Sequence, residues 1–153
     1  MTTKNAGKVL ELYISQKGIA HRLDKSSIDL DQNGVVEDKF YNTDINRSVL
    51  ITSIQSYELA QHNKINMQYG ALGENLLIDY NPYGLAIGTQ LQIGEVILEL
   101  SQACTLCNHL SKIDKRIPRL LKDDRGVFAK VIKQGTIKTD DKVVLLTSSV
   151  RKD

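Results

Sequence analysis

Short apolar runs bounded by glycines and turn-forming residues constrain the fold of this chain more than any other feature of its sequence. The clearest runs occupy residues 7–15, 47–52, 76–78, 89–100, 127–134 and 142–146. Gly94 divides the fourth run, Gly126 opens the fifth and Gly135 closes it. Many short strands of this kind, with few helices between them, are typical of barrels. We therefore predict a mainly β fold, a β-barrel with a few peripheral helices.

Two segments have the spacing of helices. Ser53 can cap a helix that places Ile54, Tyr57 and Ala60 on one face and ends near Asn63. A second apolar pattern of helical spacing runs over residues 108–122, where Pro118 should give one bent helix or two short ones. A further short strand is expected at residues 26–30.

The length and charge pattern exclude several classes of protein. A chain of 153 residues fits one domain, and we expect a core over about residues 7–146. Twenty basic and eighteen acidic residues are mixed along the chain, which does not favour a nucleic-acid partner. Neither a signal-peptide pattern nor a run of eighteen apolar residues is present, so we expect a cytoplasmic protein without a membrane partner.

The only two cysteines, Cys104 and Cys107, form a C-x-x-C pair. In reduced cytoplasm this spacing indicates thiol chemistry or metal binding. Zinc with His109 as a further ligand is one alternative, but a structural zinc site needs four ligands and the other histidines, His21 and His62, are distant in sequence. Cys104 could act as a resolving thiol that captures a sulfenate or persulfide on Cys107, but an inert, packed cysteine is its favoured interpretation.

An ordered set of motifs resembles the MOSC family, the domain type found at the C-terminus of molybdenum cofactor sulfurases. The set comprises Gly34, Asp38, Arg47–Ile51, Gly70–Leu76, Ile87-Gly88, Ile93–Glu95, Leu98-Glu99, Gln102, Cys107, Leu110, Arg125–Val127, Val131, Gly135, Ile137, Asp141 and Val143. The resemblance covers about residues 7–146.

The resemblance implies a β-barrel that uses a cysteine to ligate the molybdenum of a pterin cofactor or to carry sulfur as a persulfide. The partners would then be molybdopterin or a sulfur-donor protein. A molybdenum-dependent reductase of N-hydroxylated compounds and a non-catalytic binding scaffold remain as alternatives. Pyridoxal phosphate is not expected, because in the sulfurases it belongs to a separate domain.

Cys107 is the candidate catalytic residue and the candidate molybdenum ligand, because it occupies the cysteine position of the family. A thiolate is a soft metal ligand and a nucleophile. The predicted helix start just after Cys107 would lower the pKa of its thiol.

The candidate cofactor-binding residues are Gly73, Glu74, Asn75, Arg47 and Asp38. Gly73 lets backbone approach a ligand, while Glu74 and Asn75 offer an acceptor and an amide suited to a pterin edge. The alternative for this pair is a turn fixed by its own hydrogen bonds. Arg47 could bind a phosphate or pair with Asp38.

Two positions depart from the family pattern. The Gly-Asp-x-His loop of the family reads Glu37-Asp38-Lys39-Phe40 here, so the histidine is replaced by Phe40. The Gly-Asp of the closing hairpin reads Asp140-Asp141. We expect the fold to tolerate both changes and the chemistry of the pocket to differ.

Overall fold

The computed structural model describes residues 2–19, 22–105 and 108–147, apart from the side chains of 2, 108, 109 and 147. Its strands are β1 (Thr2–Ile14), β2 (Leu23–Lys25), β3 (Ser27–Asp31), β4 (Gly34–Val35), β5 (Val49–Ser53), β6 (Leu76–Ile78), β7 (Gln90–Ile93), β8 (Val96–Ala103), β9 (Val127–Lys133), β10 (Gly135–Lys138) and β11 (Lys142–Thr147). Its helices are η1 (Ile45–Arg47), α1 (Ile54–His62), η2 (Asn108–Lys112) and α2 (Ile117–Leu120).

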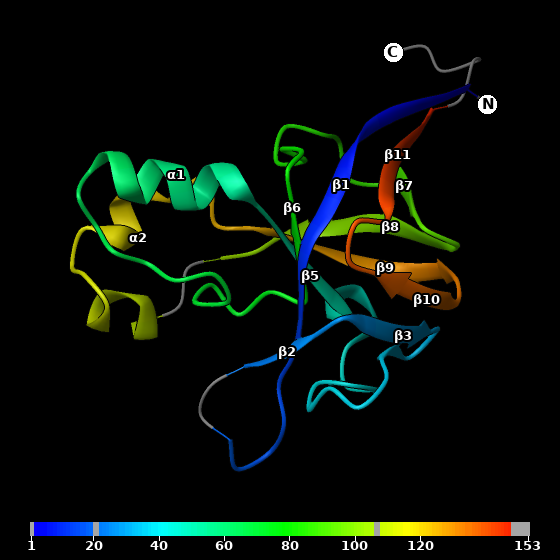
Figure 1. Cartoon of the computed structure of the whole chain (residues 1–153), viewed down its shortest axis with the longest axis horizontal. Helices are drawn as coiled ribbons and strands as arrows, with labels where there is room; N and C mark the ends of the chain where they lie inside the picture. The colour runs from blue at the N-terminus through cyan, green and yellow to red at the C-terminus, as the bar shows by residue number, and fades with distance from the viewer. Residues whose placement is uncertain (1, 20–21, 106–107, 148–153) are drawn as a thin grey trace.

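Seven of the described strands close into a barrel, which confirms the predicted fold class. Their order is β11-β7-β8-β9-β5-β6-β1, and pairing of β1 with β11 completes the circle. All the barrel pairs are antiparallel except β5 and β6. A smaller sheet, β10-β3-β4, lies beside the barrel, whereas α1 and α2 lie together at the other side of the molecule (Figure 1).

The barrel interior is filled by aliphatic side chains from every barrel strand. Leu91, Leu98 and Leu100 are each 0% exposed, and Leu91 lies opposite Leu98 across β7 and β8. The alternation predicted for β1 is interrupted, because the register of β1 shifts between Val9 and Glu11. Val9 and Leu12 are therefore both buried although they are three residues apart.

The helix predictions hold. The Ser53 hydroxyl caps α1 by accepting the Gln55 N–H at 3.1 Å, and α1 ends at His62. The second helical segment is split into η2 and α2, with Pro118 in the first turn of α2, where its missing N–H leaves no intrahelical bond unmade. No helix among the described residues is long and apolar enough to cross a membrane.

The remaining differences arise at turns. Arg47 ends the short helix η1 and the strand starts at Val49, because Asp44 caps η1 through the Asn46 N–H. Gly135 opens β10 rather than closing the preceding strand. Because it has no Cβ, Gly135 can pass close to Glu95, whose Cγ would lie 2.7 Å from a Cβ at that position. Asp140 adopts a φ of 74° in the closing hairpin, a conformation that Asp tolerates better than most residues.

Candidate functional site

A cavity of about 770 Å³ opens at one end of the barrel. Its wall is built from the end of β1, the loop over residues 38–48, the loop over residues 68–75, and the ends of β8 and β9. Leu50, Cys104 and Phe128 form an apolar cluster on one side of it. The volume lies in the range of sites for small molecules and cofactors.

Asp38 is the buried acid of this cavity and is 6% exposed. Its carboxylate accepts the Ser15 N–H at 2.6 Å and the Phe40 N–H at 3.0 Å. Arg22 Nη2 lies 3.6 Å from Asp38 Oδ1. Burial lowers the pKa of Arg22, and the charge of Asp38 opposes that shift. Asp38 therefore pairs with Arg22, a residue that the sequence did not single out, rather than with Arg47.

Asn75 ties three parts of the cavity wall together. Its Oδ1 accepts the Leu50 N–H at 3.0 Å, and its Nδ2 donates to the Tyr13 carbonyl at 3.2 Å and to Asp38 at 3.4 Å. Asn75 lines the cavity, but both of its amide protons are already used by the protein. Its observed bonds make it a brace between β1, β5 and the Asp38 loop.

Gly73 also lines the cavity, and Glu74 does not. Gly73 has a φ of 85°, and a Cβ added there would meet only the end of Arg22, at 4.0 Å. The Glu74 side chain is 0% exposed and accepts hydrogen bonds from Thr52 and Tyr57. Glu74 thus lies behind the cavity wall, with Gly73 on the cavity side.

Arg125 is the functional candidate that the sequence analysis missed. It lines the cavity, is only 3% exposed, and its Nε and Nη1 have no hydrogen-bond partner among the described residues. Gly126 has a φ of 148°, and a Cβ at this position would lie 3.1 Å from Leu50 Cδ1 and 3.3 Å from the Ile51 carbonyl oxygen, so the segment after Arg125 packs closely against β5. The Arg-Gly-Val motif was part of the family resemblance, and that was the only signal for Arg125.

Arg47 is exposed and lies on the same cavity, with its guanidinium carbon 4.6 Å from the centre of the Phe128 ring. Stacking on a ring leaves its N–H donors available to a ligand. Four cationic residues line the cavity, Arg22, Lys39, Arg47 and Arg125, against two anionic ones, Asp38 and Asp44. The excess of two positive charges favours an anionic ligand.

Cys104 lies at the cavity wall, 7% exposed, and its thiol contacts the Thr105 carbonyl at 3.5 Å. Cys107 lies outside the described residues, as do His21 and the side chain of His109. Within the described part of the chain, no three His, Cys, Asp or Glu side chains are grouped as metal ligands. The roles expected of Cys107 therefore stay predictions.

Comparisons with known proteins agree with this architecture. The YUAD protein of Bacillus subtilis superimposes with a TM-score of 0.80 at 16% identity, over 96% of this chain and 99% of that one. YiiM of Escherichia coli gives 0.69 at 18% identity, over 95% of this chain and 71% of that one. YiiM of Geobacillus stearothermophilus gives 0.67 at 12% identity, over 97% and 77%.

At these identities the structural likeness establishes the fold alone. A search of curated proteins finds no match to the chain. The family model of the MOSC domain, however, matches residues 38–144, which include Asp38, Arg47, the Gly73–Asn75 turn and Arg125. The chain therefore belongs to the MOSC domain family, which is associated with the molybdenum cofactor.

Proposed function

We propose that the chain binds a molybdopterin-type cofactor in the cavity at the end of the barrel. The observation that carries this proposal is the Arg125 side chain, which is buried at the cavity wall with its Nε and Nη1 unpartnered among the described residues. An unpartnered buried cation is costly, so its retention calls for an anion that binds there. The phosphate of a pterin cofactor is such an anion.

The other residues of the cavity fit the same ligand. Arg22 would add a second positive charge to the same cavity wall, and Arg47 would present its donors at the exposed side. Gly73 would let its backbone approach the pterin. Asp38 and Asn75 would hold the loops that form the wall, since their polar atoms are engaged with Ser15, Leu50 and each other.

Cys107 is proposed as the thiolate ligand to molybdenum. Cys104 lines the cavity and precedes Cys107 by three residues, which supports this assignment. When bound, the metal would supply two-electron redox chemistry, and this chain would supply the thiolate, the anion-binding arginines and the shape of the pocket. We further propose that the protein acts in the cytoplasm, where the thiol stays reduced.

A persulfide carrier is the second candidate, and it also uses Cys107. The arginines favour cofactor binding over this alternative, because a sulfur atom held on a cysteine does not require a buried cation. A reductase of N-hydroxylated compounds would be one outcome of cofactor binding, and a non-catalytic scaffold would be another.

The test is the metal and phosphate content of protein purified from a host that makes the molybdenum cofactor. Wild type should carry molybdenum and organic phosphate in equal amounts per chain, and Cys107→Ser should lose the molybdenum while melting at the temperature of wild type. Alkylation at limiting reagent should label Cys107 before the buried Cys104. Molybdenum-free wild type bearing a reducible persulfide would favour the carrier, and full molybdenum in Cys107→Ser would overturn the thiolate assignment.

A further inference from the structure

Behind the cavity wall, helix α1 is connected to the glycine-containing loop by a buried pair, Tyr57 and Glu74. We infer that this pair positions residues 70–73, so that the cavity has its shape before a ligand enters. Neither side chain lines the cavity, so both would act through the loop rather than by touching a ligand. The consequence for cofactor retention rests on the proposed function, whereas the consequence for the loop does not.

The Tyr57 hydroxyl uses every hydrogen-bonding position that it has. It accepts the Gly70 N–H at 3.1 Å and the Leu72 N–H at 3.3 Å, and it donates to Glu74 Oε2. A tyrosine hydroxyl has one proton and two acceptor sites. Because the hydroxyl donates its hydrogen bond to the carboxylate, both of its acceptor sites are free for the Gly70 and Leu72 N–H groups.

Glu74 is itself fixed from the barrel. Its Oε2 also accepts the Thr52 hydroxyl of β5 at 2.8 Å, and its side chain is 0% exposed. Burial and the charge of Glu74 raise the pKa of Tyr57, so the hydroxyl remains a donor. A barrel strand, the carboxylate, the helix and the loop are thus connected in one buried chain of hydrogen bonds.

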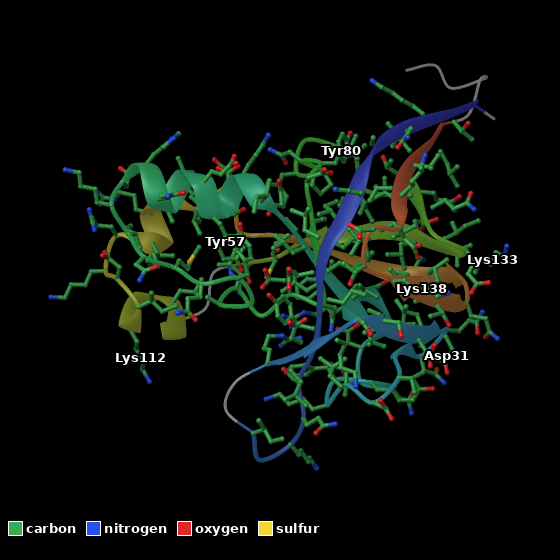
Figure 2. All side chains as sticks on the ribbon, viewed as in Figure 1. Asp31, Tyr57, Tyr80, Lys112, Lys133 and Lys138 are labelled. Carbon is green, nitrogen blue, oxygen red and sulfur yellow. The ribbon has the colours of Figure 1, made fainter. Side chains whose placement is uncertain are left out.

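The loop needs this support because it has no strand partner. Residues 70–73 lie outside the sheets, and two of the four are glycines with φ of 91° and 85°. Glycines raise the number of conformations that the loop could adopt. All four residues line the cavity, so the position of the loop decides the shape of the cavity on that side. Figure 2 shows Tyr57 on the side of α1 that faces the loops.

Tyr83, in the turn after β6, provides a matched control because its hydroxyl bonds to the same helix. Its partly buried hydroxyl is bonded at the start of α1, to the N–H of the cap residue Ser53 and to Ser56 Oγ at 2.7 Å each. Tyr83 does not line the cavity, and none of the described hydrogen bonds joins it to residues 70–73. Changing either tyrosine to phenylalanine removes one hydrogen-bonded hydroxyl. The free energy of unfolding should therefore fall by a similar amount in the two variants. Only Tyr57→Phe should remove the hydrogen bonds that hold residues 70–73 in place.

The experiment measures amide hydrogen exchange residue by residue in wild type, Tyr57→Phe and Tyr83→Phe. We expect exchange at Gly70 and Leu72 to rise about tenfold in Tyr57→Phe and to stay near wild type in Tyr83→Phe. Glu74→Gln retains an acceptor for Tyr57 and should give an intermediate increase. Unchanged exchange in Tyr57→Phe, or equal increases in both tyrosine variants, would overturn the inference.

Molybdenum content of the same proteins separates this inference from the proposed function. Tyr57→Phe should retain several-fold less molybdenum than Tyr83→Phe at equal melting temperature. If wild type holds no molybdenum, the proposed function fails while the exchange result still decides the positioning role. If the loop is released and molybdenum retention equals that of Tyr83→Phe, the inferred role in shaping the site is wrong.

Discussion

The interior of the barrel and the cavity at its end are stabilised in different ways. The interior is aliphatic, with side chains such as Val9, Leu91 and Leu98 wholly buried. The cavity wall instead buries polar residues, among them Asp38, Asn75 and Arg125. Apolar burial is non-directional and tolerates small shifts, whereas each buried polar group requires a partner in a defined place. Arg125, whose Nε and Nη1 lack a partner within the described part of the chain, therefore points to a function rather than to folding.

The largest effect on stability should come from the barrel interior. Leu98 packs between Leu91 on β7 and Val131 on β9. Leu98→Ala should lower the free energy of unfolding by ~2–5 kcal/mol, because it leaves a cavity in a closed core. Chemical denaturation would measure this. The partly exposed Ile132→Ala, on β9, is the control, and equal losses in the two variants would contradict the account of the core.

The next effect should come from the buried acid of the cavity. Asp38→Asn removes the counter-ion of Arg22 and one of the two oxygens that accept the Ser15 and Phe40 N–H groups. It should lower the free energy of unfolding by ~1–3 kcal/mol. Asp44→Asn removes the same charge from the exposed side and keeps the cap of η1, so its unfolding free energy should stay near wild type. Equal unfolding curves for the two variants would show that Asp38 is not a structural acid.

Arg47 should matter less for stability than for binding. Arg47→Ala removes an exposed cation stacked on Phe128, which costs about 1 kcal/mol or less. Retention of the anionic cofactor should nevertheless fall, and Arg47→Lys should restore part of it by restoring the charge. Molybdenum content and denaturation of both variants would measure this. Wild-type retention in Arg47→Ala would remove Arg47 from the binding site.

The sequence predicted the barrel better than the cavity. The runs that became β5, β7, β8, β9 and β11 were visible because burial on the barrel leaves an apolar pattern. The cap of α1 was visible because Ser53 precedes an apolar face. The short strands β2, β4 and β10 were missed because two to four residues carry little pattern.

The cavity depends on contacts between residues far apart in the chain, which no local pattern reveals. Arg22 forms an ion pair with Asp38, sixteen residues further along the chain. Tyr57, on α1, donates a hydrogen bond to Glu74. Four of the candidate cofactor-binding residues, Asp38, Arg47, Gly73 and Asn75, line one cavity, and their role in binding stays a prediction. The position of Glu74 behind the wall could not be read from the Gly73–Asn75 turn, because the turn alone does not fix which side chain faces inward.

If Arg125 binds an anionic cofactor, the substitution Arg125→Met should abolish that binding without harming the fold. Methionine keeps much of the length and removes the buried charge, so the free energy of unfolding should be unchanged or higher. The molybdenum content per folded chain should fall at least about tenfold, because the loss of a charged hydrogen bond costs ~1.5–3 kcal/mol. The exposed Arg119→Met serves as the control and should retain the cofactor. Full molybdenum retention in Arg125→Met, with a large loss of stability, would show that Arg125 is a structural residue and contradict the account.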